Sequence, residues 1–128
     1  FNVKKKKTMP TRRFEEKFGF RKRKRDALHV LKKFPSRVPV ILQLGAEVPG
    51  VRRLFKKKYL VPCDMKVGQF MAVVRSKLFL KPHQALYLIT KKKGTMPPTS
   101  ALMISIYHDN MDDDYFLYLD LYAENTFG

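Results

Sequence analysis

The most regular hydrophobic pattern in the chain lies between residues 67 and 78. Apolar side chains recur there at i, i+3, i+4, i+7 and i+11, namely Val67, Phe70, Met71, Val74 and Leu78. This spacing puts them on one face of a helix and predicts an amphipathic helix packed against a core. Lys66 stands where Ser, Thr or Asp would cap such a helix, so we expect its first turn to lack a side-chain cap.

A sparser helical pattern covers residues 14–34. It is interrupted near Gly19 and ended by Pro35, and its apolar positions are Phe18, Ala27, Val30, Leu31 and Phe34. Because eight of the other positions are Lys or Arg, the pattern predicts one or two short basic helices with a narrow apolar stripe.

Four extended runs predict strands at residues 38–44, 58–61, 86–89 and 115–122. Pro39 cannot donate a ladder hydrogen bond, which favours a sheet edge or a strand start for the first run. The last run is almost entirely apolar and suits the buried centre of a sheet. Residues 100–107 predict a short helix. The order of elements indicates an α+β fold of the ubiquitin-like β-grasp type, in which the last strand lies centrally beside the first.

The chain carries a net charge of +16, and the charge is concentrated near the N-terminus. Residues 1–37 hold 15 Lys and Arg against three acids, whereas residues 38–128 hold 12 against eight. We therefore divide the chain into a basic mobile arm (1–13), an N-terminal helical subdomain (14–37), a β-grasp core (38–122) and a C-terminal tail (123–128). Such basic runs fit a solvated face, nuclear targeting, nucleic acid, anionic lipid or an acidic protein surface, and charge alone does not choose among them.

Candidate catalytic and metal-binding residues are sparse. His29, His83 and His108 are far apart without partners at metal-ligand spacing, and Cys63 follows an apolar strand as a packed thiol would. The acid-rich segment 109–120 resembles half a calcium loop but has Asp114 where that loop needs glycine, so we expect a solvated turn. No nucleotide or hydrolase fingerprint and no membrane-length apolar run occurs in the sequence. We expect no enzymatic activity, no metal and no cofactor.

Several runs, in order along residues 20–128, resemble the autophagy ubiquitin-like modifiers, the family of GABARAP and microtubule-associated protein light chain 3. The matching runs are Lys33–Ile41, Lys56–Pro62, Val67–Phe70, Met96–Ser100 and Asp114–Tyr118. The likeness is nearest to the GABARAP branch. It implies a β-grasp domain preceded by two helices, in agreement with the hydrophobic pattern.

The resemblance also implies a function. The family is conjugated through a C-terminal glycine, here Gly128, to phosphatidylethanolamine by activating-type and conjugating-type enzymes after a processing cysteine protease has exposed that glycine. The implied protein is a cytoplasmic monomer that lies on autophagosomal membranes when conjugated. It would recruit receptors or adaptors that carry an aromatic-x-x-aliphatic motif, which binds by β-augmentation.

Family positions carried over to this sequence imply two pockets. The aromatic pocket would comprise Asp26, Val30, Pro39, Ile41, Lys58, Leu60 and Phe116. The aliphatic pocket would comprise Tyr59, Val61, Pro62, Met65, Phe70 and Val73. Acidic residues flanking the motif would meet Arg37, Lys56 and Lys77. We expect the peptide to lie along residues 39–44, although Ile41, Leu60, Phe70 and Phe116 also suit a plain core.

Several features depart from the family pattern, among them Lys77 and the arm. Lys77 replaces the usual Arg, so a two-pronged contact with a carboxylate is lost. The arm is more basic than usual, which leaves two alternatives: a nucleic-acid-binding module on the same scaffold, or an arm that docks on anionic lipids or microtubules. Phe18 and Phe20 among the cations offer weak support for nucleic acid, because exposed aromatic rings can stack on bases.

Overall fold

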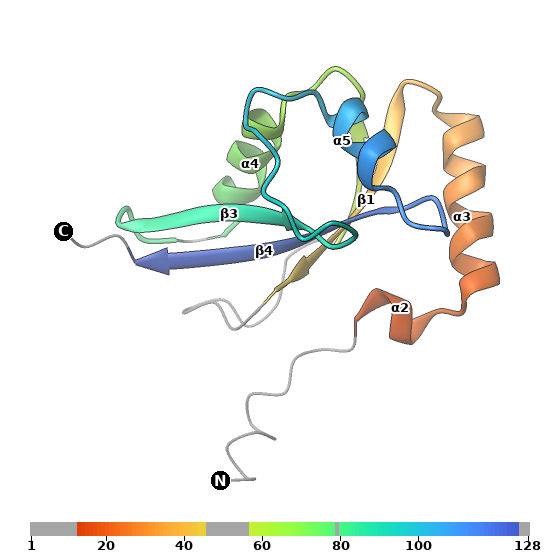
Figure 1. Cartoon of the computed structure of the whole chain (residues 1–128), viewed down its shortest axis with the longest axis horizontal. Coiled ribbons are helices and arrows are strands. Elements are labelled where there is room, and N and C mark those ends of the chain that lie inside the picture. Colours follow the sequence, from red (N-terminus) through yellow and green to blue (C-terminus); the bar gives the residue numbers. More distant parts are fainter. Residues whose placement is uncertain (1–12, 46–56, 79, 126–128) are drawn as a thin grey trace, which may run out of the picture.

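The computed structural model describes residues 13–45, 57–78 and 80–125. Along the chain the elements are α2 (Phe14–Lys17), α3 (Phe20–Lys33), β1 (Arg37–Leu44), β2 (Lys58–Pro62), α4 (Val67–Ser76), β3 (Gln84–Thr90), α5 (Met103–Asn110) and β4 (Leu117–Asn125) (Figure 1). The predicted helices and strands therefore all form, with shifted ends. The short helix α5 begins three residues later than the pattern suggested, and β4 extends to Asn125, into the segment assigned to the tail.

The four strands form one mixed sheet in the order β2-β1-β4-β3. β1 pairs in parallel with β4, and the two outer pairs are antiparallel. The last strand thus lies in the centre beside the first, as the sequence predicts, and the ubiquitin-like β-grasp fold with two preceding helices is confirmed.

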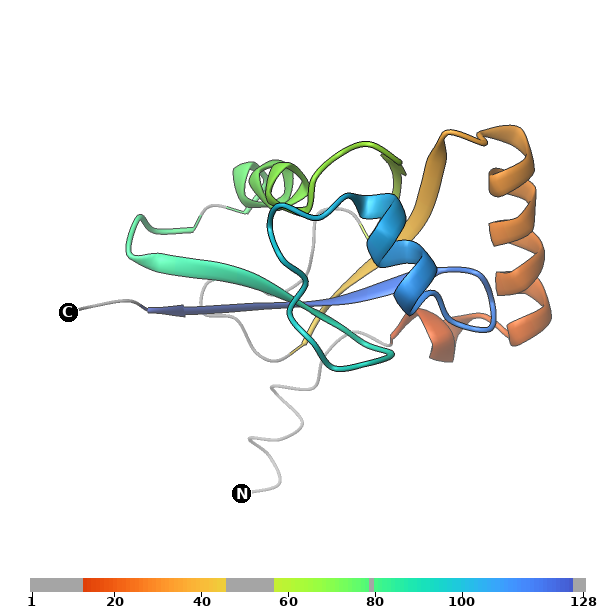
Figure 2. The ribbon, with the colours of Figure 1, turned by 45° about the horizontal axis from the view of Figure 1, so that its top comes forward.

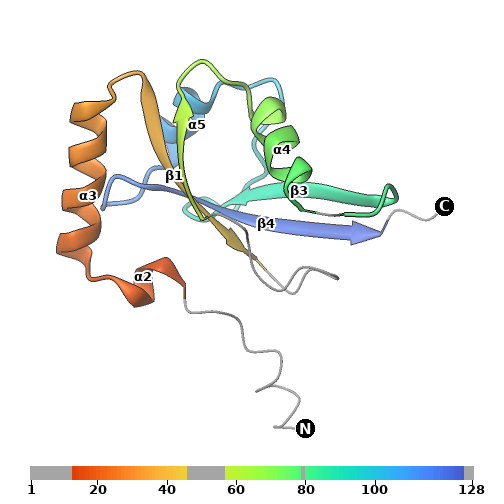
Figure 3. The ribbon, with the colours of Figure 1, turned by 180° about the vertical axis from the view of Figure 1, so that it is seen from behind.

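The sheet buries side chains on both faces. On β4, Leu117, Leu119 and Leu121 point into the larger core, which α4 and α5 cover. Phe116 and Tyr118 alternate with them and join a smaller cluster on the opposite face, together with Phe14 from α2, Ala27 from α3 and Ile41 from β1. Figures 2 and 3 show this arrangement: α4 and α5 lie on one side of the sheet, while α3 stands at one end and α2 lies below.

The placement of β1 corrects the expected position of the peptide and decides between the two positions that Pro39 allowed. β1 is not an edge strand: β2 pairs with it along residues 37–41 and β4 along residues 40–44, so a peptide along residues 39–44 would have to displace one of them. Pro39 is tolerated because pairing with β4 begins only at Val40. The missing N–H of Pro39, the third residue of β1, therefore falls just before this pairing begins, near the strand start that its chemistry also allowed.

Backbone carbonyls outside α4 satisfy the start of this helix. Lys66 makes no side-chain cap, as expected, but Val67 N–H donates to Ala101 O and Gly68 N–H donates to Thr99 O, both at 2.9 Å. A Cβ on Gly68 would lie 3.3 Å from that Thr99 oxygen, so glycine permits this close approach. The Gln69 side chain in turn accepts from Lys66 N–H at 2.8 Å. The helix is thereby held to the segment before α5.

Asp114 is the centre of a buried polar network, and the prediction of a solvated turn was wrong for this residue. Its side chain is 2% exposed. One oxygen accepts from Arg23 Nε at 2.9 Å and from the Tyr118 hydroxyl, and the other accepts from Phe116 N–H at 3.0 Å. Arg23 also donates to Phe18 O at 2.6 Å and to Glu15 O. These bonds tie α2 and α3 to the beginning of β4. Among the described residues, no group of three His, Cys, Asp or Glu side chains is arranged to hold a metal ion.

We expect Arg23→Gln to destabilise the fold by about 3–5 kcal/mol, because it leaves the Asp114 carboxylate buried without its cation. Urea unfolding would measure the loss. Arg25→Gln is the matched control, since Arg25 is exposed on the same helix and its loss should cost less than about 0.5 kcal/mol. Equal stabilities of the two variants would contradict a structural role for the pair.

The stability should also fall in alkali. Burial raises the pKa of Tyr107 to about 12, and burial together with the Asp114 hydrogen bond raises the pKa of Tyr118. In the unfolded chain both phenols ionise near pH 10, before they do so in the folded protein. The free energy of unfolding should therefore hold steady to about pH 9 and fall as the pH rises above about 10. Urea unfolding between pH 8 and 11 should show a shallower fall in Tyr118→Phe, and an unchanged slope would refute this assignment.

Candidate peptide-binding site

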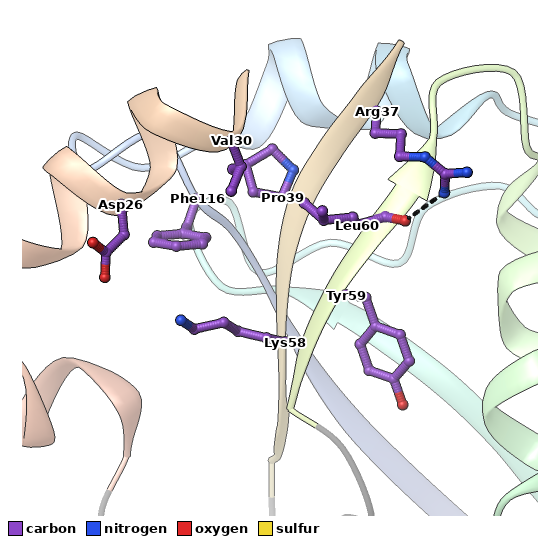
Figure 4. A pocket seen from close by; sticks show the side chains of 8 residues that line it. All are labelled: Asp26, Val30, Arg37, Pro39, Lys58, Tyr59, Leu60 and Phe116. Atoms are coloured by element: carbon purple, nitrogen blue, oxygen red, sulfur yellow. Dashed lines mark hydrogen bonds between the residues drawn. The ribbon is translucent and has the colours of Figure 1, made fainter. Parts of the chain in front are cut away.

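A hollow of about 410 Å³ lies between α3 and the β1–β2 hairpin. Its size falls in the range of sites that take up a large side chain or a small ligand. Figure 4 shows the side chains that line it: Asp26, Val30, Arg37, Pro39, Lys58, Tyr59, Leu60 and Phe116.

The apolar part of the hollow comes from three elements and the segment before β4. Val30 projects from α3, Pro39 from β1 and Leu60 from β2, while Phe116 immediately precedes β4 (Figure 4). Phe116 is buried and packs in the smaller cluster, so it forms a rigid wall. The Arg23–Asp114 pair, together with Ala27 in the smaller cluster, holds α3 beside the sheet at the hollow.

Cations dominate the rim of the hollow. The Lys58 ammonium lies 5.5 Å from the centre of the Phe14 ring, a cation–π contact that draws this side chain toward α2. Asp26 is the single acid among the described lining residues, and it pairs with Lys22 at 3.4 Å. Arg37 and Lys58 are thus placed to meet negative charge on a ligand that enters the hollow.

The strand beside the hollow has an open edge. β2 is the outer strand of the sheet and pairs only with β1 among the described strands. Leu42 N–H bonds to Lys57 O at 2.8 Å, and the alternation of an antiparallel ladder then turns the backbone N–H and C=O of Leu60 away from β1. The Arg37 guanidinium donates to that Leu60 carbonyl at 3.1 Å. An added strand would find there an N–H that faces away from β1, and a C=O that Arg37 can release.

α2 is fastened below this site by a second set of contacts. Arg13 Nη2 pairs with Asp120 Oδ1 at 2.7 Å, and Phe14 N–H donates to Gln43 Oε1 at 2.9 Å. Lys91 also pairs with Glu15. Arg13, which the sequence assigned to the mobile arm, is therefore anchored to the sheet. The rest of the arm, residues 1–12, lies outside the described residues.

Of the seven residues assigned to the aromatic pocket, six line the hollow together. Ile41 does not: it is completely buried in the smaller cluster, with Phe14, Ala27, Phe116 and Tyr118. Side chains alternate along β1, so Pro39 and Ile41 lie on the same face of the strand. Pro39 reaches the hollow, whereas Ile41, two residues further on, is covered by α2 and α3.

The residues assigned to the aliphatic pocket gather on the α4 side of β2. Val61 and Phe70 belong to the larger core, and Tyr59 and Met65 pack against it partly buried. The Tyr59 ring meets Phe70 edge to face at 5.3 Å, and burial raises the pKa of Tyr59. Val73 remains 39% exposed on α4, and Pro62 ends β2 half-buried.

The residues assigned to acidic flanks of the motif lie apart. Arg37 lines the hollow, whereas Lys77 is exposed at the end of α4. Lys56 and the proposed conjugation site Gly128 lie outside the described residues.

Sequence reasoning missed the residues that hold the site together. Arg23 stands in a run of five cations, and no feature of the sequence distinguishes it from the other four. The sequence around Phe14 likewise does not indicate that its ring lies against Lys58. Asp114 looked like one of three equivalent acids in a row. Their roles depend on contacts between segments about 40 to 90 residues apart, for which the local pattern contains no signal.

The arrangement is suited to binding an extended chain. No His, Cys or Ser side chain is among the lining residues that the structure describes. An apolar hollow, a cationic rim and an open strand edge together fit an extended peptide with one large apolar side chain. In the described part of the chain, no helix is long and apolar enough to cross a membrane.

The fold is that of a ubiquitin-like protein, and comparisons with known proteins identify its family. The family model described as "Autophagy protein Atg8 ubiquitin like" matches residues 22–128. Autophagy-related protein 8 of Coccidioides immitis is 42% identical over 116 residues, covering 91% of this chain and 97% of that protein. Autophagy-related protein 8d of Arabidopsis thaliana is 42% identical over 115 residues, covering 90% and 93%.

A solved structure agrees with these relatives. The crystal structure of Trypanosoma brucei ATG8 superimposes with a TM-score of 0.80 at 35% identity, covering 92% of this chain and 99% of that chain. The chain therefore belongs to the Atg8 family of ubiquitin-like autophagy proteins. The nearer likeness to the GABARAP branch stays a prediction.

Proposed function

We propose that this protein is a modifier of autophagic membranes, without enzymatic activity of its own, which recruits receptors through the hollow between α3 and β2. The observation that carries the proposal is the coincidence of an apolar hollow with the open edge of β2. A receptor segment would extend the sheet along residues 58–62, not along 39–44, and insert its aromatic side chain between Val30, Leu60 and Phe116. Its aliphatic side chain would lie on the α4 side, near Tyr59 and Val73.

The rim charges support an acidic flank on such a segment. Arg37 and Lys58 lie at the hollow, and Lys77 lies on α4 beyond it. Lys77 offers a single point charge where a guanidinium would offer a planar fork, so we expect this flank to contribute affinity with little geometric selectivity. Buried aromatic and aliphatic anchors would each offer about 1.5–3 kcal/mol before ordering costs, and the anchors therefore outweigh any exposed ion pair.

Replacing Tyr59 and Leu60 together by Ala should abolish binding of an aromatic-x-x-aliphatic peptide, because it removes walls that serve both anchors. The domain should stay folded, although weakened, since Tyr59 loses its contact with Phe70. Isothermal titration calorimetry would measure affinity, and chemical shifts of the labelled wild-type protein would locate the peptide.

The matched control replaces two exposed apolar residues outside the hollow, Met96 and Leu102, by Ala. This variant should bind the peptide like the wild type. Shifts confined to residues 1–13, or an unchanged affinity of the Tyr59/Leu60 variant, would refute the assignment of the groove.

We further propose that the carboxyl group of Gly128 is joined to the amine of phosphatidylethanolamine, after processing by a cysteine protease and transfer through activating-type and conjugating-type enzymes. Support comes from membership in the Atg8 family, whose model matches through residue 128. Gly128 follows the last described residue of β4, Asn125, by three positions. A residue without Cβ suits a tail that must enter a narrow enzyme cleft. The protein would then act at autophagosomal membranes.

Deleting Gly128 should prevent conjugation, and Gly128→Ala should slow it sharply, because a methyl group beside the reacting carbonyl restricts the backbone. A reconstituted reaction with phosphatidylethanolamine vesicles, followed by the gel shift of the product, would measure the rate. Thermal stability and peptide affinity should not change. Conjugation at the wild-type rate without Gly128 would refute this site while leaving the peptide groove intact.

A further inference from the structure

The outward side of α3 carries a second surface, separate from the hollow. α3 turns Asp26 and Val30 toward the hollow and Ala27 toward the smaller cluster. Its opposite side is exposed and holds Arg21, Lys22, Arg25, Leu28, His29, Lys32 and Lys33. Figure 2 shows this helix standing beside the sheet, so that one of its sides faces away from the rest of the fold.

Cations dominate this surface. Five Lys and Arg side chains lie on about three turns of helix, and the one acid of the helix, Asp26, is on the hollow side and paired with Lys22. Like charges at i and i+4, such as Arg21 and Arg25, destabilise an isolated helix, so helix stability does not explain them. The stripe is complementary to a surface of dense negative charge.

Exposed apolar side chains interrupt the cations. Leu28 is 43% exposed near the middle of the helix and Phe20 is 46% exposed at its start. Phe20, Lys24 and Leu28 follow each other at i, i+4 and i+8, directly beside Arg21, Arg25 and Lys32. Leu28 thus lies exposed between Arg25 and Lys32, and an apolar side chain among cations suits a helix lying in a membrane interface, where acyl chains meet charged headgroups.

Two observations favour an anionic bilayer over a nucleic acid. Arg23 and Lys24 both lie over the Phe20 ring, at 5.7 and 5.9 Å from its centre, so its face is not free to stack on a base. Leu28 has no hydrogen bond or stacking surface to offer a polynucleotide, whereas a bilayer interface accepts it. We propose that the outer side of α3 docks on the surface of membranes rich in anionic phospholipid, with Leu28 entering the interface.

The proposed docking does not depend on the peptide groove or on Gly128. The hollow opens on the other side of α3, and β4 ends at the far end of the molecule from this helix (Figures 1 and 3). The experiment therefore uses the unconjugated full chain and measures its binding to vesicles of phosphatidylcholine alone or with 30% phosphatidylserine.

We expect the triple variant Arg21→Gln, Arg25→Gln, Lys32→Gln to bind the phosphatidylserine vesicles about 100-fold more weakly than the wild type. The matched control Lys66→Gln, Lys81→Gln, Lys93→Gln removes the same charge from exposed residues outside α3 and should weaken binding less than threefold. Affinity for the receptor peptide and the unfolding temperature should stay unchanged in both. Equal losses in the two variants would show that net charge alone acts and would overturn the proposal.

Leu28→Ser tests insertion separately, because it leaves every charge in place. Vesicle binding should weaken about three- to tenfold, with an unchanged dependence on salt. Unchanged binding of Leu28→Ser would overturn docking at the interface. Competition with single-stranded RNA gives a second test. If RNA binds the same α3 cations more tightly than the vesicles do, and Leu28→Ser does not change that binding, nucleic acid is the partner and the proposal of membrane docking is overturned.

Discussion

The buried ion pair between Arg23 and Asp114 is the constraint on which the site depends. It joins two segments 91 residues apart, and Asp114 also holds the backbone of Phe116 through its other oxygen. Removing two charges from water is costly, and a hydrophobic pair of the same volume would often be at least as stable. The pair fixes the position of α3 relative to the sheet. Arg23 donates to the Phe18 carbonyl as well, so one guanidinium holds the start of α3 against the start of β4. The hollow is the space left between the helix so placed and the sheet.

Hydrophobic periodicity was sufficient to predict the elements of the fold. The helix at 67–76 and the strands follow from the side chains that face the larger core, and the central place of the last strand follows from its apolar run. Strand ends and edges were less predictable. Pro39 allowed two positions, and only the start of pairing with β4 at Val40 decides between them. β4 continues to Asn125 because β3 pairs with it up to that residue, although its last residues are polar.

The candidate site was predictable mainly through the family resemblance. Val30, Leu60 and Phe116 looked like ordinary core residues, and their common hollow became visible only when α3 and β2 were placed. Ile41 shows the limit of transfer by position, because an apolar residue beside a pocket can lie wholly beneath it. Local sequence could not show that one helix would serve two surfaces. α3 is basic throughout, and burial alone separates the cation that builds the fold from those that face outward.

The parallel pairing of β1 with β4 has a consequence for how the chain folds. The two strands at the centre of the sheet are joined residue by residue across a separation of 77 positions, from Val40 to Leu117. A ribosome delivers β1 long before its partner, so β1 has only the β2 hairpin to pair with until nearly the whole chain has emerged. Closing such a long loop is slow compared with forming local contacts. During synthesis one side of an apolar strand therefore remains open to other chains, and a chain shortened before residue 117 would never close it.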